Sequence, residues 1–223
     1  VIENDLMVPA TSTSETRSET TAPVRLRTHL FLGRGAKHLE VSVEIDNEAS
    51  DHRLRALFPT DISTDYCYAD GQFDIVRRAI TPWRGWTNPS NPQPQQAFVD
   101  ISDGTRGLCI ANRGLPSYEI LRTGRNTIAI TLLRSIGEIG DWGKFPTPDA
   151  QGIGVHLAEY AIIPHTGLIT DPESCDAAQV AYEYCAPLWG TQVKHFMHPH
   201  KERWANDLPA EGRLIQVTPT YLV

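Results

Sequence analysis

Most of this chain consists of short segments in which apolar and polar side chains alternate, each ending at a cluster of turn-forming residues. Residues 24–32 place Val24, Leu26 and Leu30 on one face, and Gly33-Arg34-Gly35 follows as a turn. Residues 39–45 alternate in the same way, with Glu and Ser on the second face. A period of two is typical of strands with one wet face, so the two segments predict an antiparallel hairpin.

Similar segments continue along the chain. Strand-like runs cover 52–58, 73–76, 97–101, 107–111, 118–121, 128–133, 155–163 and 213–217. Sixteen Gly and sixteen Pro separate them, and only residues 175–184 have a helical pattern. Many short strands divided by Gly, Pro, Asn and Asp predict an all-β sandwich or barrel. We expect one such domain over residues 23–223, preceded by a polar leader or edge-strand remnant at 1–22.

Both ends suggest a piece of a longer protein. The chain opens at Val1 without Met, residues 11–21 are nearly all Thr, Ser or Glu, and the apolar run 218–223 stops without a turn signal. An interrupted strand would leave an unpaired edge. We therefore expect the chain to associate with another chain or with a second copy of itself.

Composition excludes two classes of partner. Lys and Arg number 20 against 27 Asp and Glu, giving a net charge of −7 without a basic stripe, so we expect no nucleic acid. No stretch reaches the ~18 apolar residues of a membrane span, so we expect no membrane. The cysteines Cys67, Cys109, Cys175 and Cys185 lack CxxC spacing. Buried or idle thiols in a reducing compartment explain them best, which favours the cytoplasm.

Two segments interrupt the strand pattern. Residues 83–96 carry Trp83, Trp86 and several Pro, and residues 137–154 carry Trp142, Phe145 and two Pro. The first segment is either a lid whose tryptophans cover a sheet face or a binding loop, and we favour the lid. Two long loops at one end of a sandwich would build a cleft.

Candidate chemistry in the sequence is sparse. Asp65, Asp70 and Asp74 could pair as in a glycosidase, but Arg77 and Arg78 nearby explain them equally well as structural ion pairs or turn caps. A second candidate is the H-x-x-H-x-H cluster His195, His198 and His200, which fits a solvated loop better than a zinc site because nothing there fixes the geometry. No nucleophile elbow, P-loop or dinucleotide fingerprint is present.

Several strings, taken in order, resemble a known family. They are HRLRALFPT from His52, ADGQFDIVRR from Ala69, GLPSYE from Gly114 and ITLLRSIG from Ile130, followed by PDAQ from Pro148 and IPH from Ile163. Their order over residues 37–165 resembles the C-terminal β-domain of bacterial α-mannosidases of glycoside hydrolase family 38 and of the similar mannosylglycerate hydrolases.

The resemblance implies a fold and a role. Family members are retaining α-mannosidases with an Asp nucleophile and a zinc ion held by His and Asp. Those residues lie N-terminal to the matched region, so no catalytic or metal residue is transferred to this chain. The matched domain is a large β-sandwich of the galactose-mutarotase-like type, which packs on the catalytic domain and helps to wall the substrate cleft.

On this basis we assign expected roles. Leu54, Phe58, Ile130 and Leu132 should pack the core. Polar and aromatic side chains near turns should contact a mannose-containing carbohydrate or the facing catalytic domain through charge-assisted hydrogen bonds and stacking. These are Asp70, Gln72, Asp74, Arg77, Trp83, Trp86, Arg113 and Tyr118.

The first hypothesis is thus a non-catalytic β-sandwich portion of an α-mannosidase-type hydrolase. The alternatives are an independent carbohydrate-binding module that uses Trp83, Trp86 and the carboxylates, and a purely structural domain.

Overall fold

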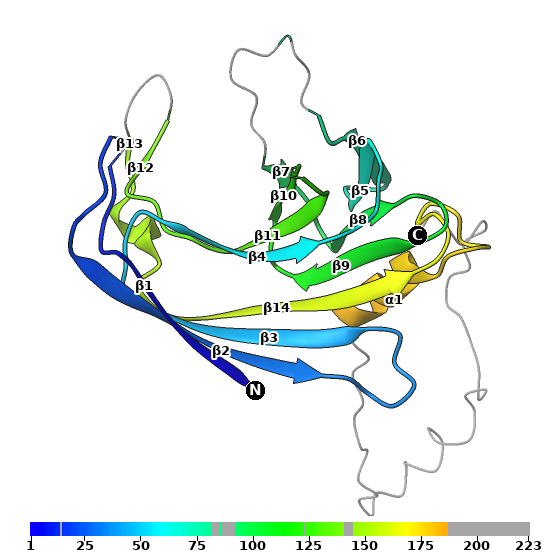
Figure 1. The fold of residues 1–223 in the computed structure, drawn as a ribbon, viewed down its shortest axis with the longest axis horizontal. Helices are drawn as coiled ribbons and strands as arrows, with labels where there is room; N and C mark the ends of the chain where they lie inside the picture. Colours follow the sequence, from blue (N-terminus) through cyan, green and yellow to red (C-terminus); the bar gives the residue numbers. More distant parts are fainter. Residues whose placement is uncertain (14, 82–84, 86–91, 123, 141–144, 187–223) are drawn as a thin grey trace, which may run out of the picture. The chain divides into compact units, whose positions relative to one another are not determined.

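The computed structural model describes residues 1–13, 15–81, 85, 92–122, 124–140 and 145–186 (Figure 1). These residues form antiparallel sheets of eight and four strands, together with a two-stranded hairpin. The predicted all-β sandwich is therefore confirmed. Its strands are β1 (Ile2–Pro9), β2 (Thr21–Phe31), β3 (Leu39–Asn47), β4 (Arg53–Pro59), β5 (Tyr66–Asp70), β6 (Ile75–Ala79), β7 (Gln93–Pro94), β8 (Phe98–Ser102), β9 (Gly107–Arg113), β10 (Ser117–Leu121), β11 (Thr127–Arg134), β12 (Glu138–Ile139), β13 (Phe145–Pro146) and β14 (Gly154–His165).

The eight-stranded sheet has the order β1-β2-β3-β14-β9-β8-β5-β6. β2 and β3 form the predicted hairpin, in register from Val24 opposite Asn47 to Phe31 opposite Glu40. β14 follows β13 in sequence but lies between β3 and β9, as the long yellow strand in Figure 1 shows. This long-range insertion places the last strand of the sheet at its centre.

The polar beginning of the chain contributes a strand. β1 pairs with β2 along its whole length, from Ile2 opposite Thr28 to Pro9 opposite Thr21. Its outer edge bears no further strand among the described residues. The segment expected as a leader or edge-strand remnant thus holds an edge strand of the large sheet.

The main core lies between the two sheets. The four-stranded sheet, in the order β4-β11-β10-β7, contributes Tyr118, Ile128 and Ile130, all at most 1% exposed. The rings of Phe58 and Tyr160 meet edge to face across the sheets, with centroids 5.5 Å apart. Ile130 and Phe58 were expected in the core, and both pack in this cluster.

A helix covers the opposite face of the large sheet. The predicted helical segment forms α1 (Ala177–Cys185), whose Ala177, Val180 and Ala181 pack against Phe98 and neighbouring apolar residues of the sheet. The contacts of α1 are mainly with β9 and β14. No helix within the described ranges is long and apolar enough to cross a membrane.

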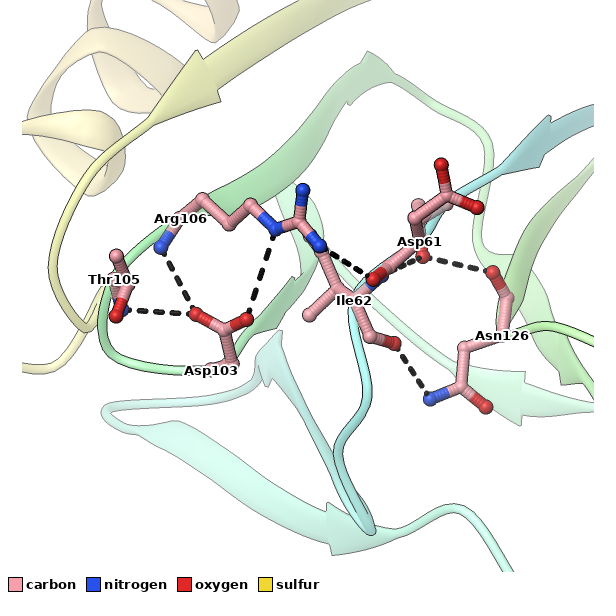
Figure 2. A network of polar contacts seen from close by, with 7 residues as sticks. Asp61, Ile62, Asp103, Thr105, Arg106 and Asn126 are labelled. Carbon is pink, nitrogen blue, oxygen red and sulfur yellow. Dashed lines mark hydrogen bonds and ion pairs between the residues drawn. The ribbon is translucent and has the colours of Figure 1, made fainter.

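Polar contacts join the turns at one end of the two sheets (Figure 2). Arg106, in the β8–β9 turn, donates from Nη2 to the carbonyl of Asp61 at 2.7 Å. Asn126, beside β11, donates to the carbonyl of Ile62 at 3.1 Å. Backbone N–H groups of Arg106 and Thr105 bind the Asp103 carboxylate and lower its pKa. The β4–β5 connection is thereby fixed against turns of both sheets.

Parts of the two predicted excursions can be followed. In the first, β7 pairs with β10. In the second, β12 pairs with β13, and the 3₁₀ helix Pro148–Gln151 follows. Residues 86–91 and 141–144, like the predicted strand at 213–217 and the final run 218–223, lie outside the described residues. The cleft between two loops therefore stays a prediction.

We predict that the inter-sheet core dominates stability. Replacing Ile130 by Ala should lower the free energy of unfolding by about 3 kcal/mol, because three buried heavy atoms are lost and a cavity remains. Leu57→Ala, on the exposed side of β4 where the side chain is 52% exposed, should change it by less than about 0.5 kcal/mol. Urea unfolding of the 223-residue chain measures both, and equal effects would contradict the assigned core.

Candidate interdomain and carbohydrate-contact site

Four of the eight predicted contact residues lie on the hairpin of β5 and β6. Asp70 ends β5, Arg77 lies within β6, and Gln72 and Asp74 lie in the turn between the strands. The N–H of Gly71 donates to the carbonyl of Asp74 at 2.9 Å and closes the turn. Gln72, Asp74 and Arg77 are exposed, so three polar side chains of this hairpin reach solvent.

The most unusual residue of the hairpin is Phe73. Its sequence pattern predicted the start of a strand at 73, but β6 begins at Ile75 and Phe73 lies in the turn with φ at +66°. Its side chain is fully exposed. A bulky side chain in the left-handed region costs about 1–2 kcal/mol and persists only where the surrounding turn imposes it. Such outliers gather at binding and contact sites, so Phe73 joins the candidate site.

Asp70 connects the β5–β6 hairpin to the interior of the domain. Its side chain is buried, and one carboxylate oxygen accepts the backbone N–H of Ala97 at 2.9 Å. The other oxygen accepts the hydroxyl of Tyr182, on α1, at 2.7 Å. Burial and this hydrogen bond raise the pKa of Tyr182. Both oxygens of Asp70 are thus engaged inside the domain, where they tie the end of β5 to the residue that precedes β8 and to the helix.

Two arginines of β6 stabilise the hairpin, Arg77 by a contact within it and Arg78 by contacts with neighbouring strands. The guanidinium of Arg77 lies over the ring of Tyr66, 4.7 Å from its centroid. Arg78, which is not among the eight predicted contact residues, donates to the carbonyl of Pro94 at 2.6 Å and to the hydroxyl of Tyr118 at 3.1 Å. Tyr118 itself is 1% exposed, and burial raises the pKa of its hydroxyl. The predicted residue Tyr118 therefore meets the base of the hairpin inside the core.

Arg113 binds the C-terminal end of α1. Its Nε and Nη2 donate to the carbonyl of Tyr184 at 3.1 and 2.9 Å, and its guanidinium lies 4.1 Å from the centroid of that ring. A cation at the C-terminal end of a helix satisfies carbonyls that lack partners and interacts favourably with the helix dipole. Arg113 thus holds the end of α1, the helix that also carries Tyr182, the partner of Asp70.

The remaining predicted residues lie outside the described part of the chain. These are Trp83, Trp86 and the histidine cluster His195, His198 and His200. Whether the tryptophans act as a lid or stack on a sugar stays a prediction.

A buried polar triad lies elsewhere, at the end of β14. His165 Nε2 lies 2.7 Å from an Asp100 oxygen, and its Nδ1 lies 3.2 Å from the Cys175 sulfur. Because Asp100 and Cys175 bind opposite ring nitrogens, the three donors do not converge on one point. Among the described residues, no group of three or more His, Cys, Asp or Glu is arranged to hold a metal ion. Burial raises the pKa of the Cys175 thiol, which disfavours a reactive thiolate.

The sequence carried one signal for this triad. Asp100 interrupts the apolar run of residues 97–101, and a carboxylate at such a position needs a partner. The partner is His165, 65 positions later, and nothing local in the Pro164-His165 pair indicates it.

Comparison with known proteins decides the family. Residues 9–150 match the model of the C-terminal domain of glycosyl hydrolases family 38. The chain belongs to this family. It is 45% identical over 167 residues, or 75% of its length, to a Halalkalibacterium halodurans protein named as a mannosylglycerate hydrolase. It is 27% identical over 148 residues, or 66% of its length, to an alpha-mannosidase of Saccharomyces cerevisiae.

Solved structures agree with this assignment. The crystal structure of an alpha-mannosidase from Enterococcus faecalis V583 superposes with a TM-score of 0.74 and 35% identity over 83% of this chain. The family 38 chain covers only 22% of that structure, 18% of the H. halodurans protein and 12% of the yeast enzyme. It therefore corresponds to about a fifth or less of these relatives.

We predict opposite titration of two histidines in this family 38 domain. Burial alone would lower the pKa of His165, but the hydrogen bond and charge of Asp100 outweigh it and raise the pKa. Burial lowers the pKa of His52. In NMR titrations of the 223-residue chain, the midpoint of His165 should lie above about 6.5 and that of His52 below it.

The raised pKa of His165 also has a consequence for stability. The folded state holds this proton more tightly than the unfolded state, so the contribution is complete below about pH 6.5. It is lost as the pH rises through the folded pKa of His165. Asp100→Asn should remove this dependence, and a His165 midpoint that stays above 6.5 in that variant would contradict the role of the carboxylate.

Proposed function

We propose that this chain is a non-catalytic β-sandwich portion of an enzyme that hydrolyses α-mannosides. Membership of the C-terminal domain family supports the proposal, as do relatives named alpha-mannosidase and mannosylglycerate hydrolase. The nucleophile and the zinc ion then belong to a separate catalytic domain. The four free cysteines support a reducing, cytoplasmic location.

Zinc has no evident place in the described part of this domain. The strongest set of donors there, Asp100, His165 and Cys175, is divided between opposite sides of one imidazole ring. Side chains that do not converge do not fit a tetrahedral ion. We therefore derive no step of the hydrolysis from residues of this chain.

The role that we assign to the domain is contact, and the observation that carries it is Phe73. An exposed aromatic ring held at positive φ is costly in an isolated domain. It becomes favourable when a partner covers the ring, since burying a Phe side chain contributes about 2–3 kcal/mol. Gln72 and Asp74 beside it supply hydrogen-bonding groups for the facing catalytic domain or for sugar hydroxyls. The β5–β6 turn would then wall the mannoside cleft from one side.

The exposed ring of Phe73 also supports a second candidate function. An exposed aromatic ring beside an amide and a carboxylate also suits an independent carbohydrate-binding module, because the apolar face of a pyranose stacks on aromatic rings. Calorimetry of the 223-residue chain with mannose oligosaccharides separates the two functions. Binding that Phe73→Ala or Trp86→Ala abolishes would favour the module, and the contact role predicts no measurable heat.

We predict that the 223-residue chain alone does not turn over 4-nitrophenyl α-mannoside and does not retain stoichiometric zinc. Among the described residues, no group of side chains is arranged to bind a metal ion. Both carboxylate oxygens of Asp70 accept hydrogen bonds within the domain, so Asp70 is not available as one of two catalytic carboxylates. Release of nitrophenolate, measured by absorbance, and metal analysis of the purified chain test this. Turnover proportional to protein concentration would refute the non-catalytic assignment.

We also predict that Phe73 lowers the stability of the isolated chain but raises kcat/KM of the complete enzyme. Phe73→Gly should raise the free energy of unfolding of the 223-residue chain by about 1 kcal/mol, because glycine adopts positive φ without strain. Phe73→Ala keeps the strain and serves as the matched control. In the complete enzyme both variants should lower kcat/KM for the mannoside. A complete enzyme whose kcat/KM is unchanged by both variants would show that the ring makes no functional contact.

A further inference from the structure

The outer face of the four-stranded sheet carries arginines that the domain itself does not neutralise. Arg53 and Arg55 alternate along β4 with Leu54, which packs on the core, so both arginines point away from it. Glu119 alternates in the same way between Tyr118 and Ile120 on β10. The strand register therefore collects these charges on one face.

One carboxylate serves two of these cations. Arg53 Nη2 and Arg55 Nη1 lie 3.1 and 2.8 Å from the same oxygen of Glu119. The Glu119 side chain is only 12% exposed, and those of Arg53 and Arg55 are 30% and 28% exposed. Each guanidinium has five N–H donors, and these contacts use one from each. Glu119 thus orients the guanidinium groups of Arg53 and Arg55, while most of their N–H donors remain available.

A third arginine adds to the excess charge. The register places Arg134 of β11 directly opposite Arg53, where like charges destabilise a sheet. Arg134 is exposed and has no ion pair within the described residues. Within the described part of the chain, the three cations of this face thus have ion pairs with a single anion, Glu119, although the net charge of the chain is −7.

The other half of the face has exposed apolar residues along β4. Leu57 is 52% exposed and Pro59 is exposed, whereas the residues opposite them on β11, Ala129 and Thr127, are buried within the domain. A small anion bound at the arginines would leave Leu57 in water. A protein surface that presents carboxylates beside apolar side chains would cover both halves, as Arg and apolar groups do at protein interfaces.

We propose that this face, comprising Arg53, Arg55, Leu57, Glu119 and Arg134, docks an acidic surface of the catalytic domain of the same enzyme. The proposal rests on the proposed function, which supplies that domain. Charge complementarity selects an acidic partner, and the length of the relatives, about five times the matched region, places a large neighbour on the same chain. Such a tethered partner has a high effective concentration, so a modest interface suffices.

Zero-length cross-linking in the complete enzyme tests the proposal. Arg134→Lys keeps the positive charge and supplies an amine that carbodiimide joins to a carboxylate in direct contact. Mass spectrometry should find position 134 linked to an Asp or Glu of the catalytic domain. About 1 M NaCl, where the screening length is about 3 Å, should reduce the yield. Arg34→Lys, in the β2–β3 turn, is the matched control and should give no link to that domain.

Each other result overturns the docking proposal. A link from position 134 only to carboxylates of this domain, to a second copy or to another protein would exclude the catalytic domain as the partner. Loss of the link in millimolar phosphate, with all other links unchanged, would indicate a site for a small anion. Mannoside turnover is measured separately on the same variant, so an enzyme that shows the link but not the activity would refute the proposed function alone.

Discussion

The central strands of the large sheet are buried on both faces, and the rest of the domain depends on this arrangement. Every residue of β8 is buried, and β9 has only partial exposure at two positions. The four-stranded sheet covers one face of these strands, and α1 covers the other. Because no polar face remains there, any charged side chain in these strands must find a partner inside the protein.

The buried polar groups satisfy this requirement, and in doing so they fix the geometry. Asp100 is paired with His165, and Asp70 binds both Ala97, which precedes β8, and the helix residue Tyr182. Asn112 of β9 donates to the carbonyl of Gln96 and accepts the N–H of Leu115. Asp100 and Asp70 join segments distant in the sequence, and Asn112 joins the neighbouring ends of β8 and β9, so a hydrophobic core that would tolerate several packings is held in one.

What the sequence could predict follows from the same arrangement. Alternation identified β2 and β3 because each has one wet face, and apolar runs identified β8 and β9 because they have none. The position of β14 between β3 and β9, and the contact of Asp70 with a residue 112 positions away, depend on tertiary register. Local patterns carry no information on such distant partners. Asp70 was therefore placed near a turn correctly, but its burial could not be foreseen.

The places where the domain departs from locally favourable choices are those where we propose that it contacts a partner. Asp51 also has positive φ, but Asp tolerates this region and its carboxylate binds Gly137 and Gln151. Within the described ranges Phe73 has no such compensation, and Arg53 faces Arg134 while sharing Glu119, its one paired anion there, with Arg55. Unfavourable features that the domain does not offset internally are expected where an external partner offsets them. Both lie on the surface, whereas the buried groups Asp70, Asp100 and Asn112 have partners inside the domain, and this contrast supports the proposal that the domain acts through contact.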